Sequence, residues 1–520
     1  MNPEHLEASV TPSEAKTPER STRRSFVFFG ALAATALLPG RSYGQRSTRM
    51  RRPIHPRSRG SQPAQQPSES VAAFAEWSTS SSRLVRRVTL GVTPADMAHV
   101  SQLGYEGYLN HQLSHTRIND SVVEGIAAQK WPMMFQPSDQ LFGSDAGQLR
   151  SQLQESTIFR AAFSQRQLYH RMVELWSDHF NQDVTKVGYL LVADQRDVIR
   201  ANALGSFPAL LKASAHSASM MLYLDQESSR GGAPNQNYAR EIMELHSLGV
   251  DGGYTQNDVA ELARVLTGWT ITGKGQFTFN PATHDWGAKT VLGVTIPQGS
   301  PAYGAEGIKE GEQMLDVLAY HPSTARFIAT KMLRWLLDPN PSETQISTVA
   351  SVYRATGGDI KSMIRVILND SWLPAAPMKF KRPFHFMVST LRSANPAITI
   401  MSGINGQLSA LGHPIYTWPT PDGFPDKIEY WAGNIVPRWN FAYVLSTARS
   451  TTAVAFDAAP YLSGSPAAAV DLIDQVFFGA EMPMGTRTAL LSYVNSGTFN
   501  DQRVREAISL AISANAFQWY

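Results

Sequence analysis

Helical periodicity with clearly marked helix starts recurs along residues 71–520, and it constrains the fold more than any other feature of the sequence. Thr93, Pro94 and Asp96 form one helix start, with an N-cap residue, a proline at the first helical position and an acid at the third. Thr255 and Asp258 mark a second start, a capping box ahead of apolar residues at helical spacing. The pattern predicts a mainly α fold.

The segment near 274–296 departs from this pattern. Phe277 and Phe279 alternate with polar residues, and the run from Val291 to Ile296 is rich in β-branched residues. We therefore predict a small β-hairpin insertion there. Residues 71–520 show no repeat of constant period and no linker-like stretch, so they are predicted to form one large helical domain.

Two further helices are expected in the first half of this domain. Residues 158–180 are long enough for one major core helix, and residues 238–248 are predicted to form another. Gly249 stands where a helix ends with a residue in the left-handed conformation.

The N-terminal residues predict export. Arg23 and Arg24 precede an apolar stretch from Phe26 to Leu38, which is too short to span a bilayer as a helix. We interpret residues 1–44 as a twin-arginine-type signal peptide and expect the protein in the periplasm or outside the cell. A Sec signal and a retained membrane anchor are the alternatives. Residues 45–70 are rich in Ser, Pro, Gln and Arg, and are predicted to be a disordered basic linker.

Charge and cysteine content exclude several classes of function. The whole chain carries a formal charge of +3, but residues 45–70 contain six Arg and one Glu, so residues 71–520 are weakly acidic. That part of the chain therefore has no electrostatic footprint for nucleic acid. The absence of cysteine excludes disulfides, thiolate metal sites and cysteine nucleophiles.

Several segments together resemble a known family. They are residues 176–181, 197–200, 222–225, 237–249, 254–269, 284–285, 331–335, 381–383 and 418–423. The order and the sequences of these segments are similar to those of the bacterial exported family catalogued as domain of unknown function number 1800. The resemblance covers roughly residues 80–515. The resemblance implies an exported protein without an established activity, and a co-encoded exported sulfatase-related protein as a partner. Gln236 departs from the family pattern, which implies a glutamate there.

Two pairs of polar residues are the candidate catalytic groups. Glu241 and Glu244 are three apart and share one helix face, whereas His246 lies about 200° round the helix from Glu244. His284 and Asp285 follow in a loop between the predicted strands. The hypothesis is that the two pairs converge in a solvent-open cleft as an acid/base site.

The same residue types suit a divalent metal. His284, Asp285, Glu244 and His179 are the candidate ligands, and zinc, iron, manganese and calcium all accept such donors. The alternatives are structural. A pair of Arg240 with Glu244, an Asx-type turn at Asp285 and a hydrogen-bonded core histidine at His179 explain the same pattern.

A proline-rich loop at 416–426 is the candidate substrate-binding segment. Tyr416, Trp418 and Asp422 combine aromatic rings with a carboxylate, as sugar-binding sites do. The alternative is the packing of a rigid buried loop. Motifs for zinc proteases, serine hydrolases, phosphate-binding loops and dinucleotides are absent from the sequence. The sequence favours an exported hydrolase acting on an extracellular polymer or glycan, and dependence on a divalent metal is part of this hypothesis. A non-catalytic partner or scaffold in an envelope or secreted assembly is the alternative.

Overall fold

The computed structural model describes residue 77, residues 79–450 and residues 453–520. The predicted signal peptide at 1–44 and the predicted linker at 45–70 lie outside the described residues. The chain divides into two units, Met1–Ser68 and Glu69–Tyr520, and the fold described below is that of the second unit.

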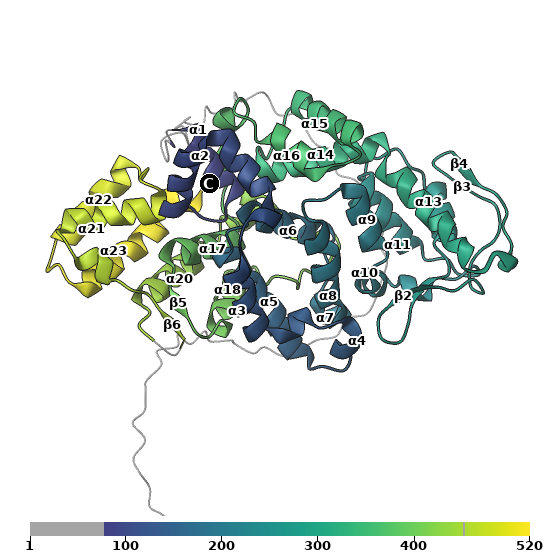
Figure 1. The fold of residues 1–520 in the computed structure, drawn as a ribbon, viewed down its shortest axis with the longest axis horizontal. Helices are drawn as coiled ribbons and strands as arrows, with labels where there is room; N and C mark the ends of the chain where they lie inside the picture. Colours follow the sequence, from purple (N-terminus) through teal and green to yellow (C-terminus); the bar gives the residue numbers. More distant parts are fainter. Residues whose placement is uncertain (1–76, 78, 451–452) are drawn as a thin grey trace, which may run out of the picture. The chain divides into compact units, whose positions relative to one another are not determined.

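The described residues of this unit form a mainly α fold, as predicted (Figure 1). The α-helices up to residue 265 are α1 (Ser80–Val88), α2 (Pro94–Leu113), α3 (Ser121–Lys130), α4 (Ser138–Leu141), α5 (Ala146–Phe163), α6 (Gln167–His179), α7 (Val184–Val187), α8 (Leu190–Ala193), α9 (Phe207–Ala215), α10 (Ala218–Tyr223), α11 (Gln236–Glu241) and α12 (Gln256–Val265).

The remaining α-helices follow the strand-containing segment. They are α13 (Ile308–Ala319), α14 (Pro322–Leu336), α15 (Glu343–Thr356), α16 (Ile360–Ile367), α17 (Pro383–Ala394), α18 (Ser402–Ala410), α19 (Ile428–Trp431), α20 (Ile435–Thr447), α21 (Pro466–Ile473), α22 (Met484–Asn495) and α23 (Asp501–Ser513). Helices α20 and α23 pack against each other, as do α14 and α15. None of the helices in the described ranges is long and apolar enough to cross a membrane.

Short helical turns of other types join these elements. The 3-10 turns are η2 (His115–Arg117), η3 (Pro132–Phe135), η5 (Gln226–Ser228), η7 (Pro301–Gly307), η8 (Leu373–Ala375), η9 (Ala459–Leu462) and η11 (Asn515–Gln518). The π-helical turns are η4 (Asp194–Arg200), η6 (Ile242–Ser247) and η10 (Asp474–Phe478). Such π turns often occur at functional sites.

The strands form three small antiparallel pairs in the described part of the chain. Strand β1 (Trp269–Ile271) pairs with β2 (Phe277–Phe279), and β3 (Lys289–Val291) pairs with β4 (Val294–Ile296). Strand β5 (Ala397–Ile398) pairs with β6 (Val454–Ala455). The β element predicted near 274–296 is confirmed, and it consists of two hairpins.

The two predicted helix starts are confirmed. The Thr93 hydroxyl accepts a hydrogen bond from the Asp96 amide at 3.1 Å, and Pro94 is the first residue of α2. Thr255 and Asp258 exchange the two hydrogen bonds of a capping box at the start of α12. Local sequence therefore determines where these helices begin.

Two of the expected helices are interrupted. The helix expected over 158–180 is wrong as a single element, because α5 ends at Phe163 and α6 starts at Gln167. The helix expected over 238–248 is α-helical only to Glu241 and continues as the π turn η6. Gly249 has a φ of +85°, as its predicted role at a helix C-terminus requires.

Candidate functional site

Two adjoining cavities lie beside helix α6. The larger one, the outer cleft, has a volume of about 1290 Å³, and its lining includes Asp178, His179, Lys331, Arg382, Asp422, Phe424, Tyr430 and Trp519. The smaller one, the inner chamber, has a volume of about 40 Å³, and its lining includes Ala161, His170, Val173, Glu174, Asp178, Arg200, Arg382, Phe384, His413 and Tyr416. Asp178, Arg382 and Phe424 line both cavities. The inner chamber and the outer cleft therefore share part of their walls.

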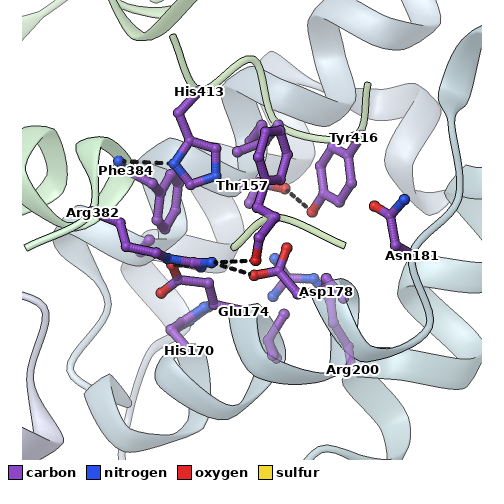
Figure 2. Close-up of a pocket in the computed structure, with 15 residues that line it drawn as sticks. Thr157, His170, Glu174, Asp178, Asn181, Arg200, Arg382, Phe384, His413 and Tyr416 are labelled. Atoms are coloured by element: carbon purple, nitrogen blue, oxygen red, sulfur yellow. Dashed lines mark hydrogen bonds and ion pairs between the residues drawn. The ribbon is translucent and has the colours of Figure 1, made fainter. Parts of the chain in front are cut away.

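Helix α6 supplies the acids at this boundary. Glu174 and Asp178 are one turn apart, so both carboxylates face the same side of the helix. Arg382 binds both: its Nη2 donates to Glu174 Oε1 at 2.5 Å and its Nη1 to Asp178 Oδ2 at 2.6 Å (Figure 2). The Arg382 guanidinium also stacks over Trp335, 4.6 Å from the ring centroid. This geometry holds the two carboxylates in fixed positions.

Asp178 has a raised pKa even though it forms this ion pair. Burial raises its pKa to about 6, the Arg382 charge opposes that shift, and the neighbouring Glu174 charge adds to it. A carboxyl group with a pKa in this range exchanges protons near neutral pH. Asp178 thus has the properties of an acid/base group at the junction of the two cavities.

A lysine and a histidine form a second polar pair in the outer cleft. Lys331 of α14 places its Nζ 2.8 Å from His179 Nδ1, and His179 Nε2 lies 3.2 Å from the carbonyl oxygen of His246 in η6. Burial, followed by the Lys331 charge, lowers the pKa of His179 well below its usual value, so the ring is neutral. His179 therefore donates from Nε2 to His246, and its Nδ1 accepts from Lys331.

In this environment the pKa of Lys331 is lowered. Burial lowers the pKa of Lys331 to about 8, and the charges of Asp178 and Asp422 oppose the shift. No carboxylate in the described residues lies within ion-pair distance of its ammonium. Lys331 is thus a cation near neutral pH and an amine in mildly alkaline solution.

A rigid loop places Asp422 in the outer cleft. The Asn181 side chain donates to the carbonyl oxygens of Trp418 and Thr420, at 2.9 and 2.8 Å. Trp418 Nε1 and Thr420 Oγ1 then donate to Asp422 Oδ1, at 3.1 and 2.5 Å. Asp422 itself is exposed. The loop therefore presents an oriented carboxylate to the solvent of the cleft.

Gly423 allows this loop to touch helix α6. Its φ is +76°, and a Cβ atom there would lie 2.2 Å from the Asp178 carbonyl oxygen. Only glycine fits such an approach without displacing the backbone. The contact brings the backbones of the segments that hold Asp178 and Asp422 together.

Tyr416, predicted to bind substrate, belongs to the inner chamber. Its hydroxyl lies 3.0 Å from Thr157 Oγ1 and donates to Gln195 Oε1 at 3.3 Å. Figure 2 shows Tyr416 and His413 on one side of the chamber, opposite residues of α6. Trp418 and Asp422, the other two predicted substrate-binding residues, are held together at the cleft by the hydrogen bond described above.

Glu241 and Glu244 have contacts of their own. The Tyr254 hydroxyl donates to Glu244 Oε2 at 3.3 Å. Arg240 donates to Gln256 at 3.0 Å, and the described residues show no ion pair between Arg240 and Glu244. Burial raises the pKa of Glu241, and the charges of Glu244 and Asp422 add to the shift, so Glu241 lies within the electrostatic reach of Asp422.

His284 and Asp285 belong to a different network, beside the hairpins. His284 Nδ1 lies 2.7 Å from the Thr267 carbonyl oxygen, and its Nε2 lies 3.2 Å from Glu310 Oε2. Asp285 accepts two hydrogen bonds from Arg264, at 2.7 and 3.2 Å. These bonds outweigh the effect of burial and lower the pKa of Asp285.

The described residues show no contact that joins the two predicted catalytic pairs. Neither Glu241 nor Glu244 hydrogen-bonds or ion-pairs with His284 or Asp285. Within the same residues, no group of three or more His, Asp or Glu side chains is arranged to hold a metal ion. The candidate site considered below is the outer cleft, because His179 and Asp422 both line it.

Sequence reasoning did not single out Glu174, Asp178, Lys331 and Arg382. The signal was present, however, because segments 176–181, 331–335, 381–383 and 418–423, which carry the family resemblance, meet at these two cavities. Segments that recur together in a family but lie far apart along a chain are candidates for one shared site.

The comparison with known families agrees with the resemblance. Residues 83–519 match the model described as Protein of unknown function (DUF1800). This chain belongs to the DUF1800 family. No curated protein and no solved structure matches it. The function of this DUF1800 member is therefore argued from the geometry of its own site.

Proposed function

We propose that this DUF1800 protein is an exported hydrolase that acts on an extracellular polymer or glycan, with the outer cleft as its substrate site. One observation carries the proposal. Asp178, with a raised pKa, and the exposed Asp422 both line the cleft, and both act electrostatically on Lys331. Two carboxyl groups in different environments are the usual acid/base equipment of glycoside hydrolysis.

The two carboxyl groups have distinct roles in this proposal. Asp178, with its pKa of about 6, is the general acid that protonates the leaving oxygen. Asp422, held by Trp418 and Thr420, is the carboxylate that activates water or attacks the sugar. Lys331 donates hydrogen bonds to hydroxyl groups of the substrate in the cleft. The roles use side chains of this chain alone; a divalent metal is not needed for these steps.

The walls of the cleft suit a glycan. Tyr430 is 50% exposed, with Trp418 5.9 Å and Trp431 4.6 Å from its ring centroid. Trp519 and Phe424 also line the cleft. Aromatic faces stack on the apolar faces of sugar rings, and nearby charged groups bind the hydroxyls. A volume of about 1290 Å³ accommodates several sugar units.

The test uses the full chain and a panel of extracellular glycans, including peptidoglycan, chitin and cellulose fragments. New reducing ends are detected by mass spectrometry. We expect turnover of at least one substrate class, and kcat/KM should fall about tenfold per pH unit above pH 6 as Asp178 loses its proton.

Two variants and one control assign the roles. Asp178→Asn and Asp422→Asn should each lower kcat by about 10²- to 10⁴-fold. Asp370→Asn is the matched control, because Asp370 is an exposed carboxylate that lines neither cavity. The hydrolase proposal is wrong if no glycan is cleaved, or if both cleft variants keep the activity of the control.

Export is part of the proposal, and it has a separate test. Arg23 and Arg24 lie outside the described residues, and the support for export is their position ahead of a short apolar run. The double change Arg23→Lys with Arg24→Lys should block export through the twin-arginine route without lowering expression. Export that persists and depends on the Sec channel would contradict it.

A second function, as the non-catalytic partner of an envelope assembly, is favoured by the surface of α20. Val436, Trp439 and Tyr443 lie on one face of this helix and are 59%, 50% and 51% exposed. Clustered exposed apolar side chains mark interaction surfaces. The partner proposed for this face is the exported sulfatase-related protein that the family resemblance implies.

Cross-linking of the full chain to that partner tests this function. Trp439→Ala should abolish the cross-link, whereas Tyr320→Ala, which removes an aromatic side chain that is 56% exposed, should leave it unchanged. Equal cross-linking by both variants would contradict the assignment of this face.

A further inference from the structure

Two residues that line the inner chamber carry polar atoms that have no partner in the described part of the chain. Glu174 Oε2 and Arg200 Nη2 are both buried and unpaired. The Glu174 side chain is 10% exposed, and its other oxygen is bound by Arg382. An unsatisfied buried polar atom destabilises a protein. A ligand that supplies one donor and one acceptor would satisfy both atoms.

The size of the chamber limits that ligand. A water molecule needs roughly 10–15 Å³ of such a volume, so a chamber of about 40 Å³ accommodates about three waters or a group of three to four heavy atoms. A whole sugar ring is too large. The chamber therefore fits a short substituent of a molecule that lies mainly in the outer cleft.

The remaining wall of the chamber is apolar or neutral. Val173 and Phe384 contribute apolar surface, and both are buried. The rings of His170 and His413 are neutral, because burial and neighbouring arginines lower the pKa of each well below its usual value. The lining contains two acids, Glu174 and Asp178, and two arginines, Arg200 and Arg382. A neutral substituent with a polar end and a methyl group matches this wall better than an ion does.

We infer that the inner chamber binds the acetamido group of an N-acetylated amino sugar whose ring lies in the outer cleft. An acetamido group has four heavy atoms, with one N–H donor, one carbonyl acceptor and one methyl group. The inference rests on the proposed function, because it defines the substrate class of the same site.

The chamber offers a partner for each part of the acetamido group. Its N–H donates to Glu174 Oε2, and its carbonyl oxygen accepts from Arg200 Nη2. Its methyl group contacts Val173 and Phe384. Figure 2 shows Glu174, Arg200 and Phe384 around the same space. The sugar ring stays in the outer cleft beside Asp178, which lines both cavities.

Two tetrasaccharides that differ only in this substituent test the inference. Chitotetraose carries an acetamido group at C2 of each β-1,4-linked unit, and cellotetraose carries a hydroxyl there. Titration calorimetry on the full chain should show that chitotetraose binds about 10- to 100-fold more tightly, which corresponds to hydrogen bonds with charged groups.

Two variants of the chamber locate the effect. Ala161→Val fills part of the chamber, and Glu174→Gln removes the charged acceptor at nearly constant shape. Each should remove most of the preference for chitotetraose, and Ala161→Val should leave the affinity for cellotetraose within about twofold, since it does not change the ion pair between Glu174 and Arg382. Asp370→Asn is again the control. If Ala161→Val misfolds, the inference is still tested by Glu174→Gln and by the affinities of the wild type for the two tetrasaccharides.

The outcomes separate the two proposals. Equal affinity for the two tetrasaccharides, or a preference that survives both variants, overturns the acetamido site and leaves the glycan cleft intact. Binding of neither tetrasaccharide, together with no cleavage of any glycan in the panel, overturns the proposed function and the acetamido site with it.

Discussion

Two regions of the molecule combine a buried histidine, a lysine and nearby carboxylates, but with opposite results. Beside the hairpins, Lys289 donates to Glu310 at 2.6 Å, and His284 lies 3.2 Å from the same carboxylate. In the outer cleft, Lys331 donates instead to the neutral ring of His179. The first cluster satisfies its charges internally, whereas the second faces a cleft.

The difference shows that residue type alone does not identify a functional site. The side chains of His284 and Lys289 have no exposed surface, so solutes cannot reach them. Lys331 is half-buried, lines the outer cleft and keeps a pKa of about 8. A charge that the fold has already paired stabilises the structure, while a charge that the fold leaves without a carboxylate partner is available to a ligand.

The largest expected effect on stability comes from disrupting the cluster of His284, Lys289 and Glu310 beside the hairpins. Glu310→Ala leaves the buried Lys289 ammonium without its carboxylate, so the free energy of unfolding should fall by about 3–5 kcal/mol. Denaturant titration measures it. Glu343→Ala is the control, because the Glu343 side chain is 69% exposed in a surface ion pair with Arg326, and its loss should be under about 1 kcal/mol. Equal losses would remove the distinction between the regions.

A backbone contact stabilises the structure at the outer cleft, whereas ion pairs stabilise the region beside the hairpins. Gly423→Ala introduces a Cβ atom 2.2 Å from the Asp178 carbonyl oxygen at a φ of +76°, so stability should fall by about 2–4 kcal/mol. Gly433→Ala is the control, because a Cβ there meets nothing within 4 Å. An unchanged midpoint of denaturant unfolding for Gly423→Ala would show that the loop does not need this contact.

Exchange of each lysine for methionine compares the two clusters directly. Lys331→Met removes a cation from the cleft and should lower kcat/KM by about 10- to 100-fold, with a change in stability under about 1 kcal/mol. Lys289→Met should instead lower stability and leave turnover per folded molecule unchanged, because the side chain is inaccessible. Glycan turnover and denaturant titration are measured on both. Loss of stability in Lys331→Met together with loss of turnover in Lys289→Met would contradict the distinction between the two clusters.

The smallest expected effect is a pH dependence of stability. The pKa of Lys331 falls to about 8 in the folded chain from its usual 10.5, so the unfolded chain binds more protons between these values. Stability contributed by this group therefore rises with pH through this range, by about 1 kcal/mol between pH 8 and pH 9. The rise is measured as the difference between the wild type and Lys331→Met. A constant difference across this range would show that the folded pKa is not lowered.

The sequence by itself determined the α-helical class, the helix starts at Thr93 and Thr255, the bend at Gly249 and the position of the β element. These features depend on residues within a few positions of each other, so they can be inferred without tertiary contacts. The site was predicted less well. His179 and Asp422 line the outer cleft, whereas His284, which the same hypothesis includes, lies in a different network, and the hypothesis stays a prediction.

Only the tertiary structure decided which charged groups share a cavity. Arg382 binds Asp178 across 204 residues of sequence, and Lys331 reaches His179 across 152. Contacts at such separations depend on the packing of whole helices, which local patterns do not encode. Burial then decided the chemistry, because the same aspartate or lysine has a shifted pKa only where packing removes water from around it.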